Sequence, residues 1–191
     1  MRFLITGTTS GIGLQVAKYF EQNNEVIHLN RDTLDFSDQI AVQNYEMPVC
    51  DVLINNAGVN NTDDILQTNP NDICNTMNIN VITPMVLCNK FIQKNQTGTI
   101  INITSSSVKT TNTNSIIYHT SKCSLHSFTQ TLRNFLYGRP IRVIEVAPGP
   151  TDTRITTAST MTLETESITK CIDFALNNQH VNEIFIKVFE K

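Results

Sequence analysis

The stretch Thr6-Gly7-Thr8-Thr9-Ser10-Gly11-Ile12-Gly13 lies between a short apolar run, 2–6, and a segment of helical period, 11–22. Three glycines at a strand-to-helix turn permit positive φ angles, close approach of the backbone to a ligand and tight packing of helix on strand. The free N–H groups and the dipole at the start of the helix favour a bound anion. The alternative is a glycine-rich turn that only connects the two elements. The turn therefore predicts a parallel α/β fold with a pyrophosphate site.

Short apolar runs alternate with longer helical stretches along the rest of the chain, which predicts a parallel sheet covered by helices on both faces. Strands are expected near residues 2–6, 25–29, 33–35, 51–55, 98–103, 140–146 and 183–188, and helices near 11–22, 37–46, 70–95, 115–137 and 164–178. The strand at 33–35 can only be a stub, because the residues before it leave no room for a connecting helix. Pro84 lies inside the third helix, so a distortion is expected just before it.

Composition bounds the class of protein. The chain has 191 residues, 40% hydrophobic and 16% charged, which suits one packed domain. Fourteen Lys and Arg residues against 17 Asp and Glu give a net charge of −3. The sequence has no run of basic residues, so we do not expect it to bind nucleic acid. The five cysteines form no CxxC pair and the four histidines are scattered, so we expect reduced thiols, a cytoplasmic location and no metal site. No apolar stretch approaches the roughly 20 residues of a membrane span, and we expect neither a signal peptide nor an anchor.

Tyr118 and Lys122 are four residues apart on a predicted helix and therefore share one of its faces. A free tyrosine ionises near pH 10, and an adjacent ammonium lowers the pKa of the phenol toward the range useful for acid–base catalysis. Taken alone, such a pair is more often simply solvated. A catalytic interpretation of the pair is favoured by a hydroxyl group at the predicted edge of the sheet.

Ser105 follows the predicted strand 98–103, at the edge where open α/β sheets bind ligands. Its hydroxyl can donate to a carbonyl oxygen and stabilise the charge that develops there. Its neighbours Thr104, Ser106 and Ser107 carry hydroxyls too, and some of these satisfy backbone groups of the turn. The serine thus predicts a polarising donor near the phenol.

Six motifs in order resemble those of the short-chain dehydrogenases and reductases. They are the glycine turn at 6–13, Asn55-Asn56-Ala57-Gly58, Asn80 four residues before Pro84, Ser105, the YxxxK motif Tyr118-His119-Thr120-Ser121-Lys122, and Pro148-Gly149-Pro150-Thr151-Asp152-Thr153. The resemblance implies one doubly wound Rossmann domain over 1–191, with six to seven strands in the order 3-2-1-4-5-6-7 and a shortened third strand. It also implies a nicotinamide cofactor and hydride transfer to or from a carbonyl or alcohol.

The resemblance assigns roles to individual residues. Tyr118 would be the general acid–base, Lys122 its electrostatic partner and ribose clamp, and Ser105 the donor to the carbonyl. Asn80 would bind a relay water, although from sequence alone it is equally well a helix-distorting polar residue. The residues expected at the cofactor are Gly7, Thr9, Ser10, Gly11, Ile12, Gly13, Asn30, Arg31, Asp35, Phe36, Asn56, Ala57, Gly58, Tyr118, Lys122, Pro148, Gly149, Thr151 and Thr153.

The end of the second strand bears on the choice of cofactor. NAD enzymes usually place an acid there for the ribose 2′-OH, whereas an arginine accommodates the 2′-phosphate of NADP. This chain has Asn30 followed by Arg31, which favours NADP(H) over NAD(H), while Asp32 argues weakly the other way. The alternative for Arg31 is a loop charge that faces solvent.

The leading hypothesis is an NADP(H)-dependent carbonyl reductase or alcohol dehydrogenase acting on a small molecule. A non-catalytic NADP(H)-sensing regulatory protein is the rival, and a nucleotide-sugar epimerase is disfavoured by the glycine spacing. We expect residues 109–117 and 154–161 to set the substrate, which their composition does not identify. By resemblance, helices around 84–94 and 115–136 would pair in a homodimer or homotetramer.

Overall fold

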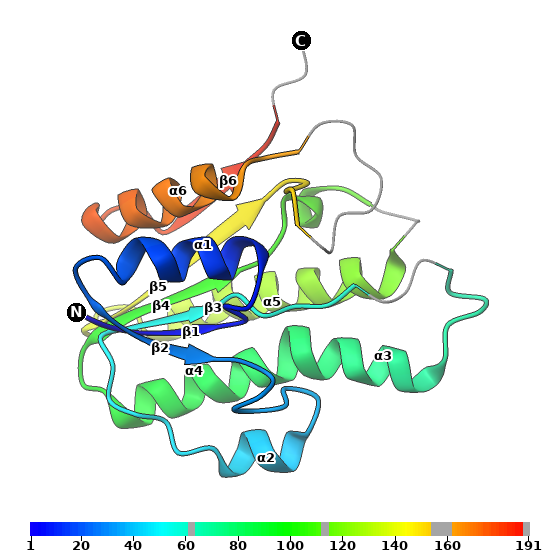
Figure 1. Ribbon diagram of the computed structural model, residues 1–191, viewed down its shortest axis with the longest axis horizontal. Coiled ribbons are helices and arrows are strands. Elements are labelled where there is room, and N and C mark those ends of the chain that lie inside the picture. The colour runs from blue at the N-terminus through cyan, green and yellow to red at the C-terminus, as the bar shows by residue number, and fades with distance from the viewer. Residues whose placement is uncertain (61–63, 112–114, 154–161, 189–191) are drawn as a thin grey trace.

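The computed structural model describes residues 1–60, 64–111, 115–153 and 162–188 (Figure 1). Strands and helices alternate along the chain as β1 (Arg2–Thr6), α1 (Gly11–Phe20), β2 (Glu25–Leu29), α2 (Gln39–Asn44), β3 (Val52–Asn55), α3 (Pro70–Met77), α4 (Thr83–Lys94), β4 (Gly98–Ile103), α5 (Ile116–Phe135), β5 (Ile141–Pro148), α6 (Thr165–Asn177) and β6 (Glu183–Ile186). A π-helical turn, Asn78–Ile82, joins α3 to α4, and a 3₁₀ turn, Ser106–Lys109, follows β4. The predicted alternation of strands and helices is confirmed.

The six strands of the described residues form one parallel sheet in the order β2-β1-β3-β4-β5-β6. The order reverses between β1 and β3, so the connections after these two strands run to opposite faces of the sheet. In sheets of this kind the ligand crevice opens at that point, beyond the carboxyl ends of the strands. The predicted doubly wound Rossmann architecture is therefore confirmed.

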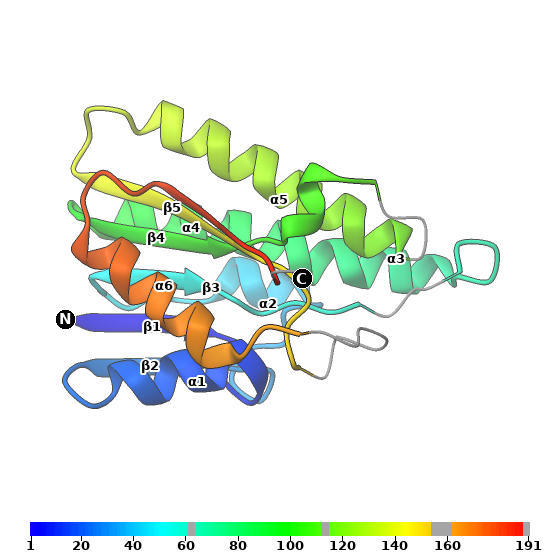
Figure 2. The ribbon, with the colours of Figure 1, turned by 90° about the horizontal axis from the view of Figure 1, so that it is seen from above.

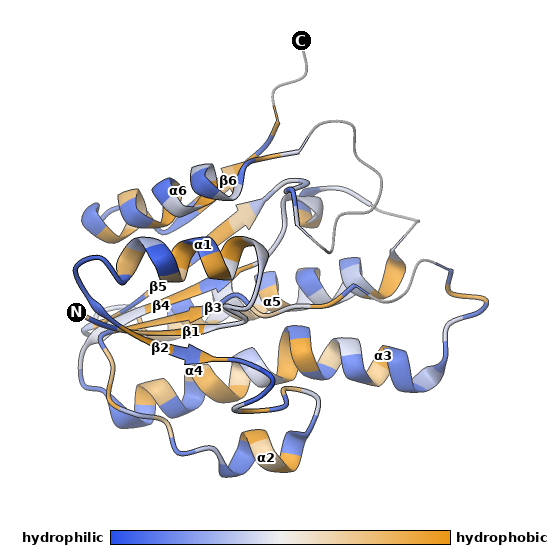
Figure 3. Cartoon of the chain, in the orientation of Figure 1, coloured by the Kyte–Doolittle hydropathy of each residue, from blue (hydrophilic) through white to orange (hydrophobic). Residues whose placement is uncertain are grey.

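Helices cover both faces of the sheet. α1 and α6 pack on one face and α2, α4 and α5 on the other, and the views in Figures 1 and 2 show these layers. Successive strand residues point to opposite faces, so Leu4 and Leu53 join one core cluster whereas Phe3 and Ile54 join the other. The hydrophobic residues of β1 and of β3 therefore follow one another directly, and polar residues stand only at the strand ends (Figure 3).

The predicted strand at 33–35 is wrong. The N–H groups of Thr33 and Leu34 both donate to the carbonyl of Asn30 at 2.9 Å, so this segment is a turn and does not pair with the sheet. Leu34 and Phe36 are nevertheless buried in the core. Their apolar alternation around Asp35, which suggested a strand, comes from a loop that packs two side chains inward.

The distortion expected before Pro84 is confirmed. The π-helical turn Asn78–Ile82 interrupts the predicted helix 70–95, and α4 begins at Thr83 with the proline in its first turn. A proline at that position has no N–H to leave unpaired, since the first turn of a helix lacks acceptors. π-helical turns frequently mark functional sites, and this one carries the buried Asn80.

A search of the described helices finds none that is both long and apolar enough to cross a bilayer.

Candidate active site

The carboxyl ends of the strands open into a cavity of about 990 Å³. Every residue that the sequence analysis assigned to the site lines this cavity, except Gly13 and Asn80. Most of the lining residues come from the segments that follow β1, β2, β3, β4 and β5 and from the first two turns of α5, and others come from α3, the π-helical turn and the segment after β6. The fold thus brings together segments that are more than 100 residues apart in the chain, from Gly7 to Thr153.

The glycine turn forms one end of the cavity with bare backbone. Gly7 and Gly11 have φ angles of +72° and +57°, a region that side chains disfavour. Gly13 lies beneath the turn, where an added Cβ would be 2.2 Å from the Gly7 carbonyl oxygen. Ser10 precedes α1 without making a side-chain capping bond to its first turn. The first N–H groups of α1 are therefore available to an anion at this end, which fits the pyrophosphate of a dinucleotide.

Asn56 and Gly58 shape the middle of the cavity. The Asn56 side-chain amide donates to the carbonyls of Thr6 at 2.9 Å and Gly7 at 3.1 Å, so the loop after β3 braces the glycine turn. A Cβ on Gly58 would be 3.5 Å from Lys122 Nζ. The absence of a side chain at Gly58 lets this loop lie directly against the lysine.

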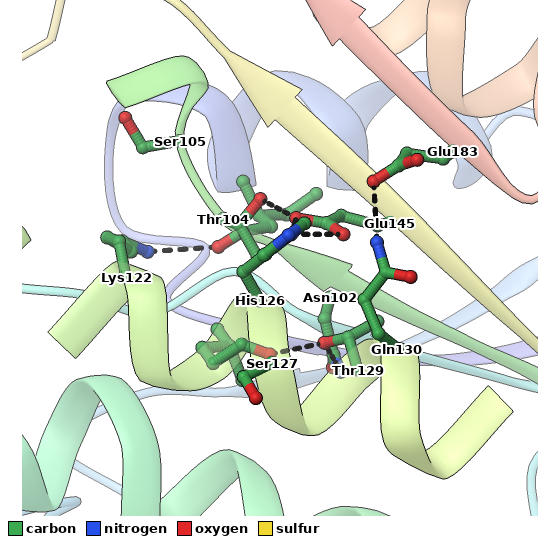
Figure 4. A network of polar contacts seen from close by, with 12 residues as sticks. Asn102, Thr104, Ser105, Lys122, His126, Ser127, Thr129, Gln130, Glu145 and Glu183 are labelled. Carbon is green, nitrogen blue, oxygen red and sulfur yellow. Dashed lines mark hydrogen bonds and ion pairs between the residues drawn. The ribbon is translucent and has the colours of Figure 1, made fainter. Parts of the chain in front are cut away.

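Tyr118, Ser105 and Lys122 meet at the other end of the cavity. The Ser105 side chain lies close enough to the Tyr118 phenol to lower the pKa of that phenol. Lys122 Nζ lies 5.7 Å from the centroid of the Tyr118 ring and donates to the Ile103 carbonyl at 2.9 Å. Figure 4 shows Ser105 at the end of β4 and the lysine reaching toward that strand from α5. The three groups therefore converge on one region, as the sequence analysis expected.

The charges of this pair differ from the sequence-based expectation that Lys122 lowers the pKa of Tyr118. Burial raises the pKa of Tyr118, and the nearby Ser105 side chain only partly opposes that rise. Burial lowers the pKa of Lys122 to about 8, because its side chain is only 4% exposed. Desolvation thus dominates both pKa values, so the pair favours a neutral phenol beside a lysine that loses its proton more easily than a free lysine.

The buried lysine predicts a pH-dependent cost to folding. Its ordinary pKa is 10.5 and its folded value about 8, a difference that corresponds to about 3 kcal/mol at pH 7. Lys122→Met removes this cost but also the bond to Ile103, so we expect the free energy of unfolding at pH 7 to rise by about 2 kcal/mol. Urea unfolding at several pH values measures the effect.

The sign of this effect follows from the depressed pKa. Below pH 8 both states of the wild type hold the proton and the full cost applies, whereas above pH 10.5 neither does. The advantage of Lys122→Met should therefore shrink between pH 8 and 10.5. An advantage that stays constant across this range, or a less stable variant at pH 7, would contradict the burial argument.

Asn80 lies outside the cavity and is fully buried. Its Oδ1 accepts from the Val59 N–H at 2.8 Å, and its Nδ2 donates to the Val59 carbonyl and to Ser121 Oγ, both at 2.9 Å. The side chain therefore braces the loop after β3 against α5. Its role in a water relay stays a prediction.

The third region of the cavity lies at the end of β2. Asn30 Oδ1 accepts from the Thr8 N–H at 2.7 Å and from Thr8 Oγ1 at 3.0 Å, which fixes the orientation of the amide and leaves Nδ2 as a donor. Arg31 lines the cavity, and its side chain is 85% exposed. The distance from Arg31 Nε to Asp35 Oδ2 is 3.9 Å. Hydrogen bonds from Ser37 lower the pKa of Asp35. Asp32 is not among the lining residues.

Several residues that line the cavity were not expected from the sequence. Asn60 and Asn75 carry no motif, and Asn60 Oδ1 is buried without a hydrogen-bond partner. Ser106 and Ser107 belong to the hydroxyl run around Ser105, which was the available signal. The other lining residues not assigned from the sequence are Ser37, Val59, Ile79, Ile103, Thr104, Thr110, Ser115, Pro150, Lys187 and Val188. Of the segments expected to set the substrate, residues 112–114 and 154–161 lie outside the described part of the chain.

One group of side chains away from the cavity has metal-ligand character. Single ligand atoms of His126, Glu145 and Glu183 lie within 4.8 Å of one another. His126 Nδ1 is, however, already bonded to Glu145, and Glu183 accepts from Gln130 at 2.9 Å. Each of the three side chains therefore already has a hydrogen-bond partner.

The fold and the site together define a Rossmann-type α/β protein in which a tyrosine, a lysine and a serine line the same cavity as the glycine turn. The family model described as short chain dehydrogenase matches residues 31–164, and the chain belongs to this family of oxidoreductases. The chain is 30% identical over 179 residues to an uncharacterized oxidoreductase, DltE, of Bacillus subtilis, covering 78% of this chain and 71% of the relative.

Two further proteins are similar to this chain. The NADP-dependent 3-hydroxy acid dehydrogenase of Schizosaccharomyces pombe is 30% identical over 186 residues, covering 78% of this chain and 71% of the relative. The structure of a 4-hydroxyisoleucine dehydrogenase complexed with NADH superposes with a TM-score of 0.86 at 23% identity, covering 97% of this chain and 96% of the other. The structural likeness supports the fold.

Proposed function

We propose that the chain is an NADP(H)-dependent oxidoreductase that transfers hydride between nicotinamide and a carbonyl or alcohol substrate, with Tyr118 as the general acid–base. One observation carries this proposal: Tyr118, Ser105 and Lys122 line the same cavity as the glycine turn. A dinucleotide with its pyrophosphate on that turn would extend toward the tyrosine. The nicotinamide, when bound, supplies or accepts the hydride.

Each side chain has a defined part in carbonyl reduction. Ser105 donates a hydrogen bond to the carbonyl oxygen, and Tyr118 transfers its phenolic proton to that oxygen as negative charge develops. Lys122 would hold the ribose, and its ammonium form, present below the pKa of about 8, can return a proton to the phenolate and become the neutral amine. Because burial raises the pKa of Tyr118, the phenol keeps its proton at neutral pH. The phenol is therefore in the protonated form that the acid role requires.

The adenosine end supports NADP(H) as the cofactor. The Asn30 amide is held by Thr8 so that it presents a donor, and Arg31 adds a positive charge at the same end. Both groups suit the acceptor oxygens of a 2′-phosphate. Asp35 is the one carboxylate among the described lining residues, and Arg31 lies close to it. The similar Schizosaccharomyces pombe enzyme is named as NADP-dependent.

Substituting Arg31 tests this preference. Arg31→Ser removes the charge from a largely exposed side chain, so the fold should be unaffected. We expect the Kd for NADPH to rise about tenfold, which corresponds to about 1.4 kcal/mol, while the Kd for NADH changes less than about twofold. Fluorescence titration of the reduced cofactors measures both values. An equal loss for NADPH and NADH would remove Arg31 from 2′-phosphate recognition.

The rival function is a sensor that binds NADP(H) without chemistry. Oxidation of NADPH, followed by absorbance across a panel of aldehydes, ketones and quinones, separates the two functions. An oxidoreductase turns over at least one class of carbonyl compound. Tight NADPH binding without turnover on the whole panel would favour the sensor. Assembly as a homodimer or homotetramer and a cytoplasmic location stay predictions, and light scattering tests the former.

A further inference from the structure

A buried carboxylate lies behind the strand end that carries Ser105. Glu145 in β5 has a fully buried side chain, and His126 Nδ1 in α5 donates to its two oxygens at 2.8 and 2.9 Å. Thr104, the residue before Ser105, donates its hydroxyl to the same carboxylate. Figure 4 shows this group between α5 and the sheet, with Lys122 and Ser105 beside it. A buried carboxylate is costly unless it is paired and hydrogen-bonded, so the three side chains hold one another in a defined arrangement.

Three hydrogen bonds, one of them between His126 and Glu145, fasten α5 to the sheet. Lys122 bonds the Ile103 carbonyl at 2.9 Å, His126 bonds Glu145 one turn later, and Asn102 donates to Thr129 Oγ1 at 2.9 Å in the following turn. Tyr118, Lys122 and His126 are successively four residues apart and so share one face of the helix. These bonds constrain both the rotation of α5 about its axis and its position along β4.

We propose that His126 and Glu145 are positioning residues that hold Tyr118 and Lys122 of α5 at a fixed distance from Ser105 at the end of β4. The pair acts on the helix through His126 and on the strand end through Thr104. The inference rests on the proposed function, because the distance matters where the phenol and the serine hydroxyl contact one carbonyl oxygen. A misplacement of about 1 Å in such a site can cost about 100-fold in rate.

Two substitutions of His126 distinguish the effect of its hydrogen bond to Glu145 from the effect of its side-chain volume. The side-chain nitrogen of asparagine occupies nearly the place of His126 Nδ1 and can donate to Glu145, whereas leucine has no donor. We expect His126→Leu to lower kcat at least about tenfold. The Kd for NADPH should change less than kcat does, because only Lys122 among the residues proposed to hold the cofactor shifts with Tyr118, and the glycine turn and Arg31 are untouched. His126→Asn should keep kcat within about threefold of the wild type. Steady-state kinetics and cofactor titration give both readouts.

Gln130→Leu is the matched control. It removes a hydrogen bond of 2.9 Å between α5 and Glu183 in β6, one turn beyond His126, and leaves the Glu145 pair intact. Its kcat should equal that of the wild type. If Gln130→Leu lost as much kcat as His126→Leu, or if His126→Asn did not rescue, the positioning role would be overturned. Should His126→Leu fail to fold, the double variant His126→Leu/Glu145→Leu leaves no buried carboxylate and gives the same readouts.

A spectroscopic signal tests the inference without turnover. The chain has four tyrosines, so ring-labelled ¹³C tyrosine gives few resonances, and Tyr118→Phe assigns the one from Tyr118. We expect His126→Leu to shift the Tyr118 resonance and His126→Asn to leave it in place, since the resonance reports the surroundings of the Tyr118 ring, which include Ser105 and Lys122. An unshifted resonance in folded His126→Leu would overturn the inference. Absence of turnover in the wild type would overturn the proposed function alone.

Discussion

Tyr118→Phe should abolish turnover while leaving cofactor binding almost unchanged. The phenol is the proton donor in the proposed reaction, and loss of a positioned general acid typically costs 100- to 10,000-fold in rate. We expect kcat to fall at least about 1,000-fold, because phenylalanine has no hydroxyl proton to donate. The Kd for NADPH should stay within about threefold of the wild type, since the pyrophosphate end is untouched. NADPH oxidation and fluorescence titration measure the two quantities.

Tyr137→Phe is the control for this substitution. Tyr137 is 92% exposed and lies at the end of α5, away from the cavity. Removing its hydroxyl should change neither kcat nor the free energy of unfolding. If Tyr118→Phe also retained wild-type turnover, Tyr118 would have no part in the chemistry and the proposed mechanism would be wrong.

Gly13→Ala should both destabilise the chain and abolish cofactor binding. The added Cβ would lie 2.2 Å from the Gly7 carbonyl oxygen and 2.3 Å from Asn56 Nδ2, and neither can easily move. Asn56 already braces the turn through its bonds to Thr6 and Gly7. Overpacking of this kind costs roughly 1–3 kcal/mol or more, and we expect about 3 kcal/mol here. Because the turn itself must shift, the Kd for NADPH should rise at least about 100-fold.

Gly138→Ala separates this clash from the general loss of a glycine. Gly138 has a φ of +79° and no atom within 4 Å of the added Cβ, so its substitution costs only backbone strain. We expect a loss of about 1 kcal/mol and unchanged cofactor binding. Urea unfolding compares the two variants. A Gly13→Ala chain as stable as Gly138→Ala, with wild-type NADPH affinity, would show that the turn tolerates a side chain.

The sequence predicted the sheet because its central strands are continuous apolar runs and its helices have clear faces. The predicted stub at 33–35 failed for a physical reason: Leu34 and Phe36 are buried, but the Thr33 and Leu34 N–H groups bond to Asn30 inside a turn. Burial alternation alone does not distinguish a strand from a loop that packs two side chains inward. The distortion before Pro84 was predictable because the missing N–H is a local property of one residue.

The candidate site was predictable where its parts follow strand ends, since parallel strands place their carboxyl ends at one edge. The Glu145 network was not predictable, because pairing between Glu145 and His126 depends on how α5 lies over the sheet. A signal existed in hindsight: His126 follows Lys122 by four residues, and Glu145 interrupts an otherwise apolar strand. The pKa directions of Tyr118 and Lys122 were missed because desolvation depends on burial that spacing does not reveal.

The central claim is that one cavity holds a reduced nicotinamide dinucleotide with its phosphates on the glycine turn and its ring beside Tyr118. Titration of the unmodified chain with NADPH and with NADH, followed by cofactor fluorescence, tests it most directly, and the chain has no tryptophan to add indole background. Saturable binding of both, tighter for NADPH, is the predicted result. Binding of neither cofactor at concentrations up to about 1 mM, where even weak sites of about −4 kcal/mol are half filled, would contradict the account.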